Sequence, residues 1–153
     1  MMTLNFKPWQ TGWKKYLAIV PLLLLGISTD GAMAQVVGKS LVYRIDQQPY
    51  EGYFVRNEGF GDRQPLVLLI HDWDGLGSYE QRRAEMLAEQ GYATFAIDLY
   101  GQGDRPKNVE ESRRESGKLY NNRPLMLHRL LMSLEEARKL PGVDSHRSEE
   151  PHV

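Results

Sequence analysis

Residues 71–75, with the sequence HDWDG, place an imidazole, two carboxylates and an indole in one short turn. The turn follows residues 66–70, a fully apolar run that is typical of a strand buried on both faces. In open α/β sheets, ligands bind in the crevice beyond the carboxyl ends of the strands. The turn therefore lies where an α/β protein carries out its chemistry.

Several kinds of chemistry are excluded by residue type. The chain has no cysteine, so it has neither a thiolate nucleophile nor a thiolate metal ligand. A serine at a nucleophile elbow needs glycine two positions before and two after it, and no serine here has both. The spacing of the four histidines does not provide the three or four convergent ligands of a metal site. We therefore predict no metal and no cofactor.

The polar and aromatic residues near the turn have two interpretations each. Asp72 and Asp74 either belong to a functional site or accept backbone N–H groups at the turn and the following helix N-terminus. Trp73 and Tyr100 either line a substrate pocket or cover the edge of the sheet. The residues alone do not choose between these interpretations.

The elements around the turn follow an α/β pattern. Residues 41–45 and 50–55 predict a hairpin with a four-residue loop, preceded by a loose leader. A capping box formed by Ser78 and Gln81 predicts a helix over 79–90 that ends at a glycine. A second buried strand is predicted over 93–99, and a crossover between parallel strands is expected to be right-handed.

The remainder of the chain is less regular. Residues 109–119 have little apolar stripe, so we expect a surface insert there. Residues 124–140 predict a helix that begins after Asn121 or Asn122, with leucines at helical spacing that we assign to core packing. The alternation of strands and helices predicts another buried strand after residue 142, but that sequence is polar and unpatterned.

The first 34 residues have the pattern of a secretory signal peptide. Two lysines precede an apolar core at residues 16–27, and an Ala-Met-Ala site ends at Ala34. The apolar core is shorter than the roughly 20 residues that a spanning helix needs. We expect cleavage after Ala34, export to the periplasm or medium, and no membrane span afterwards. The net charge of −1, without a basic block, argues against nucleic-acid binding.

From residue 41 to 147 the chain resembles the dienelactone hydrolase family of the α/β-hydrolase fold. The resemblance rests on a front hairpin with Glu51-Gly52-Tyr53, on LVLLIHDWDGL at residues 66–76, on ATFAIDLYGQGDRP at 93–106, and on LPGVDSHR at 140–147. It implies the N-terminal half of an α/β-hydrolase, a front hairpin followed by βαβα with parallel strands. The expected organisation is a signal peptide over 1–34, a partial hydrolase domain over 35–147 and a divergent polar tail over 148–153.

The resemblance also implies roles for the turn. The backbone N–H of Trp73 would supply half of an oxyanion hole, which stabilises the negative oxygen of a tetrahedral intermediate. Asp72 stands where the family has a glutamate that contacts the resting nucleophile, and it is one methylene shorter. His71 would hold the turn by packing and hydrogen bonding and would not be the triad base. Tyr100 is a candidate for the pocket lining.

The catalytic Cys or Ser, Asp and His of the family have no counterpart in the sequence. We therefore expect a truncated or frame-shifted relative of enzymes that hydrolyse small carboxylic esters or lactones, inactive alone. Two alternatives are a secreted binding module without catalysis and a gene fragment without function. A parallel sheet that lacks its next strand leaves an apolar edge, so self-association through that edge is expected.

Overall fold

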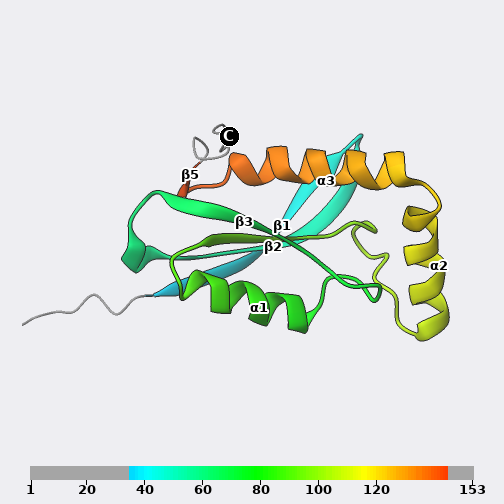
Figure 1. Ribbon diagram of the computed structural model, residues 1–153, viewed down its shortest axis with the longest axis horizontal. Helices are drawn as coiled ribbons and strands as arrows, with labels where there is room; N and C mark the ends of the chain where they lie inside the picture. Colours follow the sequence, from blue (N-terminus) through cyan, green and yellow to red (C-terminus); the bar gives the residue numbers. More distant parts are fainter. Residues whose placement is uncertain (1–34, 145–153) are drawn as a thin grey trace, which may run out of the picture. The chain divides into compact units, whose positions relative to one another are not determined.

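The computed structural model describes residues 35–144, and the predicted signal peptide and residues 145–153 lie outside this range. The described part is a mixed α/β domain with five strands and three α-helices (Figure 1). In chain order the elements are β1 (Val36–Ile45), β2 (Gln48–Asn57), the 3-10 helix η1 (Glu58–Phe60), β3 (Gln64–Ile70), α1 (Ser78–Ala88), β4 (Ala93–Ile97), α2 (Val109–Tyr120), α3 (Arg123–Arg138) and β5 (Val143–Asp144).

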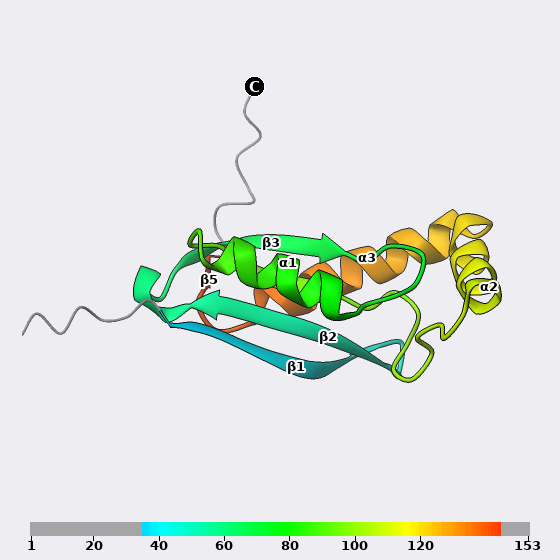
Figure 2. The same cartoon turned by 90° about the horizontal axis from the view of Figure 1, so that it is seen from below.

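The strands form one sheet in the order β1-β2-β4-β3-β5. β1 and β2 form an antiparallel hairpin at one side (Figure 2). β2 runs antiparallel to β4. β3 and β4 are parallel, with Ile70 beside Ile97. The sequence prediction of two parallel strands joined through a helix is therefore confirmed, and their carboxyl ends lie next to each other. β4 is buried throughout as predicted, whereas β3 is only partly buried.

The front hairpin is longer and tighter than predicted. Residues 36–40, expected as a loose leader, belong to β1 and pair with β2. The loop has two residues, Asp46 and Gln47, not four, and both have positive φ angles of 48° and 69°. Two-residue hairpin loops of this kind match the right-handed strand twist and usually carry Asn-Gly or Asp-Gly. Because no glycine occurs here, the short loop has no recognisable signal in the sequence.

The two faces of the sheet carry different side chains because alternate residues of a strand point to opposite faces. Phe95 and Ile97 of β4 join the cluster packed against α3, whereas Ala96 joins Ala84 and Ala88 of α1. Figure 1 shows α3 and α1 on opposite sides of the sheet. The small residues let α1 approach closely, and the aromatic core lies under α3.

α1 begins differently from the prediction. Its N-cap is Gly77, not Ser78, and the Glu80 carboxylate, not Gln81, accepts the Gly77 N–H at 2.8 Å. A Cβ at position 77 would meet only the flexible end of the Arg105 side chain, which would have to shift. At the other end Gly91, at φ +92°, donates its N–H to the Ala88 carbonyl oxygen, so the predicted glycine stop is confirmed.

α3 matches its prediction in extent but not in its apolar face. Asn122 caps it by accepting the Leu125 N–H. Two of the leucines assigned to the core, Leu127 and Leu131, are instead 54% and 53% exposed. The central residues of β3 are only half-buried although they are apolar, and Ile70 is 53% exposed. β3 and α3 therefore present apolar surface that the described residues do not cover.

A short strand does follow α3, contrary to our interpretation of this sequence as unpatterned. Val143 and Asp144 form β5, which pairs in parallel with Gln64 and Pro65 at the start of β3. The pairing fixes the side of β3 on which the sheet continues. From Leu66 to Ile70 this side of β3 has no partner among residues 35–144.

We predict that the chain self-associates through the apolar surface of α3 and the open edge of β3. Leu131→Lys should weaken this association at least about tenfold, because burial of an unpaired ammonium is strongly unfavourable. Sedimentation velocity at increasing protein concentration measures the change. Met86→Lys on α1, where the side chain is 44% exposed, is the matched control and should leave association unchanged. A wild-type chain that stays monomeric at high concentration would contradict the prediction.

Candidate active site

The site is built on His71, the first residue after β3. Its ring is 8% exposed and joins the ends of both parallel strands. Nε2 accepts the backbone N–H of Leu99 at 3.1 Å, and Nδ1 lies 2.6 Å from the carbonyl oxygen of Asp72. A neutral imidazole satisfies both contacts only when Nδ1 carries the proton. His71 thus fixes the turn after β3 to the segment after β4.

The same contact orients the peptide group between Asp72 and Trp73. The Asp72 carbonyl oxygen also accepts the Gly75 N–H at 3.2 Å, so two donors hold it inside the turn. Peptide bonds from residue 35 to 144 are trans, and in a trans peptide the N–H points away from the carbonyl oxygen. The Trp73 N–H therefore points away from the turn, and no acceptor for it is present among the described residues.

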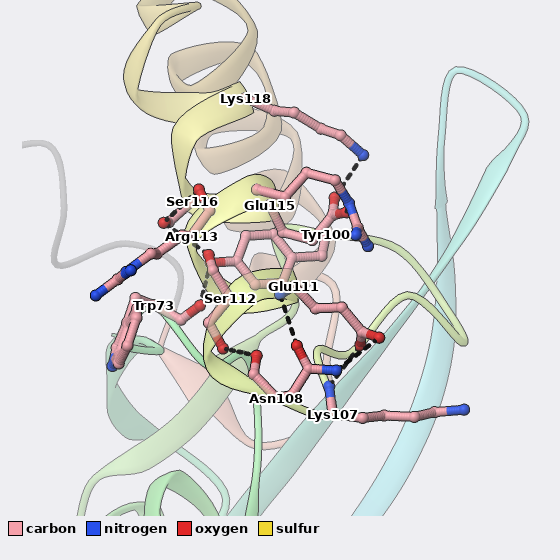
Figure 3. A network of polar contacts seen from close by, with 11 residues as sticks. Trp73, Tyr100, Lys107, Asn108, Glu111, Ser112, Arg113, Glu115, Ser116 and Lys118 are labelled. Carbon is pink, nitrogen blue, oxygen red and sulfur yellow. Dashed lines mark hydrogen bonds and ion pairs between the residues drawn. The ribbon is translucent and has the colours of Figure 1, made fainter.

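Tyr100 holds the next peptide group. Its hydroxyl donates to the carbonyl oxygen of Trp73 at 2.8 Å, and its ring lies 4.6 Å from the His71 ring, centroid to centroid. Figure 3 shows the Tyr100 hydroxyl directed at the backbone of Trp73. Burial, together with the Glu115 and Asp74 carboxylates, raises the pKa of Tyr100 to about 12. The hydroxyl therefore stays protonated as a donor at neutral pH.

Asp98 organises the second turn. Its carboxylate accepts the N–H groups of Tyr100 at 2.8 Å and of Gly101 at 3.1 Å. It also accepts the Glu51 N–H of β2 at 3.4 Å. Asp98 thus has a structural role, and it sets the position from which Tyr100 reaches Trp73.

A cavity of about 470 Å³ opens beside this arrangement. The predicted site residues His71, Asp72, Trp73 and Tyr100 all line it. The remaining lining residues come from the ends of β3 and β4 and from α2 and α3: Ile70, Leu99, Ser116, Gly117, Leu119, Tyr120 and Met126. The four residues chosen from the sequence are thus brought to one place, whereas Asp74, which does not line this cavity, is not.

α2 is a wall of the cavity, which the sequence reasoning missed when it assigned this segment to a surface insert. Asn108 caps the helix by accepting the Glu111 N–H at 2.9 Å, and Glu111 in return accepts the Lys107 N–H at 2.8 Å (Figure 3). This reciprocal cap was the one local signal for the helix. Its buried face holds Leu119 and Glu115, and the Lys118 ammonium lowers the pKa of the Glu115 carboxyl.

Other kinds of site find no support in the described part. Residues 35–144 contain no group of three or more side chains placed to hold a metal ion. No helix in this range has the length and apolarity needed to cross a bilayer. His128, the other described histidine, contacts Asp46 of the front hairpin at 2.6 Å, which places it outside the cavity.

Comparison with known proteins agrees with the arrangement. Residues 50–148 match the sequence model of the dienelactone hydrolase family. The solved structure of m3DLH matches with a TM-score of 0.65 at 25% identity, over 72% of this chain and 46% of that one. A dienelactone hydrolase-like promiscuous phosphotriesterase, P91, from metagenomic libraries matches with a TM-score of 0.67 at 23% identity, with the same two coverages. This chain thus spans a little under half of each relative, and no curated protein matched.

The raised pKa of Tyr100 predicts a fall in stability at alkaline pH. Above pH 10 an unfolded tyrosine ionises while the folded one stays protonated until about pH 12. The folded state then binds more protons, so the unfolding free energy falls between pH 10 and 12, by up to about 1.4 kcal/mol per pH unit for this residue. Tyr100→Phe should lose about 1 kcal/mol at pH 7 with the hydrogen bond and should show a shallower fall above pH 10.

Urea unfolding between pH 7 and 11.5 measures both effects. Tyr120→Phe is the control, because this ring is 70% exposed and its hydroxyl makes no hydrogen bond within residues 35–144. The control should match the wild type at pH 7. If the unfolding free energy falls equally steeply above pH 10 for the wild type and Tyr100→Phe, the Tyr100 hydroxyl is not buried as described.

Proposed function

This chain belongs to the dienelactone hydrolase family, and we propose that it carries the N-terminal half of a site that hydrolyses carboxylic esters or lactones. Its contribution to the chemistry is one oxyanion-hole donor, the backbone N–H of Trp73. In such a reaction a nucleophile attacks the carbonyl carbon, and the carbonyl oxygen takes the electron pair and becomes an oxyanion. A donor that is already oriented stabilises this charge without reorganisation.

The observation that carries the proposal is the orientation of the peptide between Asp72 and Trp73. Its carbonyl oxygen is held by the His71 ring and the Gly75 N–H. The following carbonyl, of Trp73, is held by the Tyr100 hydroxyl. Because both neighbouring carbonyl groups are held, the direction of the Trp73 N–H is fixed. It lies beside a cavity of substrate size.

The rest of the site is not supplied by residues 35–144. We propose that the nucleophile, the acid, the base and the second N–H come from a polypeptide segment that continues the sheet beyond β3. The direction of β5 and the open edge of β3 support this. Without that segment the chain would have no hydrolytic activity, because the remaining half of an oxyanion hole has nothing to stabilise.

Asp72 would take the place of the family glutamate that contacts the resting nucleophile. The side chain is solvent-exposed and lines the cavity. Being one methylene shorter than glutamate, it would reach the nucleophile less closely. Its main effect would then be the negative charge that it places on the cavity wall.

A second candidate function is a non-catalytic secreted module that binds a partner through the open edge of β3. The exposed Leu127 and Leu131 favour it, because exposed apolar patches mark interaction surfaces. A stable complex of defined stoichiometry would support this candidate over catalysis. The expected truncated or frame-shifted origin is tested by the nucleotide sequence after codon 153. It predicts a buried strand and G-x-C-x-G in another reading frame there.

We also propose export, supported by the three-part pattern of residues 1–34. The mature chain should begin at Gln35. Mass spectrometry of the protein recovered from the periplasm or medium tests this. Recovery of a chain that still begins at Met1 would contradict cleavage.

The oxyanion role predicts a specific loss in a completed enzyme. Residues 35–144 joined to the C-terminal part of m3DLH should hydrolyse p-nitrophenyl acetate. In this chimera Trp73→Pro removes the N–H and should lower kcat by about 10²–10³-fold. Trp73→Phe retains the N–H and is the matched control, with kcat close to the parent. An unchanged kcat for a folded Trp73→Pro chimera, judged by circular dichroism, would overturn the role.

A further inference from the structure

The segment after β4 is held from the helix side by Arg129 of α3. We propose that Arg129 is a positioning residue for the oxyanion donor, because it fixes the peptide group from which both supports of the Trp73 turn start. The inference rests on the proposed function, since it assumes that the Trp73 N–H is the donor. Arg129 does not line the described wall of the cavity beside Trp73. It therefore acts through other residues and does not touch the substrate.

The contact that carries the inference joins Arg129 to the peptide between Leu99 and Tyr100. Nη1 of Arg129 donates to the Leu99 carbonyl oxygen at 2.6 Å. The N–H on the other side of this peptide, that of Tyr100, donates to the Asp98 carboxylate at 2.8 Å. Leu99 is 4% exposed, so its carbonyl oxygen has little access to water. Because a peptide group is planar, holding both its carbonyl and its N–H fixes its orientation.

Both supports of the Trp73 turn begin beside this peptide. On one side, the Leu99 N–H donates to Nε2 of His71, and Nδ1 of the same ring orients the peptide that carries the Trp73 N–H. On the other side, the Tyr100 hydroxyl donates to the Trp73 carbonyl oxygen. Rotation of the peptide between Leu99 and Tyr100 would therefore disturb both hydrogen bonds.

Arg129 is itself placed by the packing of α3 on the front hairpin. Its guanidinium lies over the Tyr50 ring of β2, 5.4 Å from the centroid. One turn further along α3, the fully buried Ser133 contacts the Tyr43 hydroxyl at 3.1 Å, and this hydroxyl donates to the Asp98 carbonyl oxygen at 2.9 Å. Residues four apart lie on the same helix face. One face of α3 thus reaches two successive carbonyl groups of the segment after β4.

Stability alone does not explain an arginine at position 129. Its Nε is buried without a hydrogen-bond partner within residues 35–144, and an unsatisfied buried donor is unfavourable. A methionine would fill the space with a flexible apolar side chain and no buried donor. It would also leave the Leu99 carbonyl oxygen without its hydrogen bond. The gain from arginine is therefore this hydrogen bond and the orientation that it imposes.

The test follows the bond between Leu99 and His71 in the full chain. ¹⁵N NMR measures the scalar coupling between the Leu99 backbone nitrogen and Nε2 of His71, which exists only across an intact N–H···N bond. The coupling should be present in the wild type and lost in Arg129→Met, because a buried carbonyl without a donor is unfavourable and the peptide turns toward solvent. A folded Arg129→Met chain that keeps the coupling, or a wild type that lacks it, would overturn the inference.

Two further variants separate positioning from loss of charge. Lys139→Met removes a cation at the C-terminal end of α3, where the ammonium pairs with Glu136 at the surface, and it should keep the coupling. Arg129→Lys retains a cationic donor and should keep the coupling that Arg129→Met loses. Equal losses in Lys139→Met and Arg129→Met would show a general effect of charge on α3 and refute the role of Arg129. A loss in Arg129→Lys equal to that in Arg129→Met would refute it as well.

A measurement on the wild type alone does not depend on the folding of any variant. A hydrogen bond slows rotation of the guanidinium group, so the Nη protons of Arg129 should give separate NMR signals. A single averaged signal would overturn the inference. The proposed function is decided separately, by the effect of Trp73→Pro on kcat in the chimera.

Discussion

The site depends on one buried imidazole that spans the ends of two parallel strands. His71 accepts a backbone N–H from the segment after β4 and donates to a carbonyl in the turn after β3. These two bonds need β3 and β4 to end at the same level, and the register that places Ile70 beside Ile97 provides this. A one-residue slip of either strand would move every side chain to the other face and would separate the ring from Leu99.

The other features of the site follow from that bridge. Asp98 holds the second turn so that Tyr100 points back toward the first, and the Tyr100 hydroxyl reaches the Trp73 carbonyl. Leu119 of α2 and Met126 of α3 line the cavity on its helix side. The chain therefore builds a rigid backbone geometry and an apolar wall. It leaves to other residues the groups that form and break bonds.

Much of the fold was predictable because it is encoded locally. The continuous apolar runs at β3 and β4 identify two parallel strands, and Asn122 and Gly91 mark helix ends. The hairpin loop was missed because Asp46 and Gln47 adopt positive φ without a glycine. The leucines of α3 were placed in the core because periodicity identifies an apolar face but not what covers it.

The site was predictable in its location and not in its contacts. His71 and Leu99 are 28 residues apart, and Tyr100 and Trp73 are 27 apart, so neither hydrogen bond leaves a local pattern. The family resemblance pointed to the Trp73 N–H, whereas its orientation follows from tertiary contacts. The role of α2 as a wall of the cavity was not predicted, because a polar helix with one buried edge resembles a surface segment in sequence.

His71 orients the peptide that carries the Trp73 N–H only if its ring has one particular tautomer. Long-range ¹H–¹⁵N NMR of the histidine side chains distinguishes a protonated ring nitrogen from one with a free lone pair. We expect a proton on Nδ1 of His71, with the lone pair of Nε2 accepting the Leu99 N–H. A proton on Nε2 would contradict both hydrogen bonds and with them the orientation of the peptide.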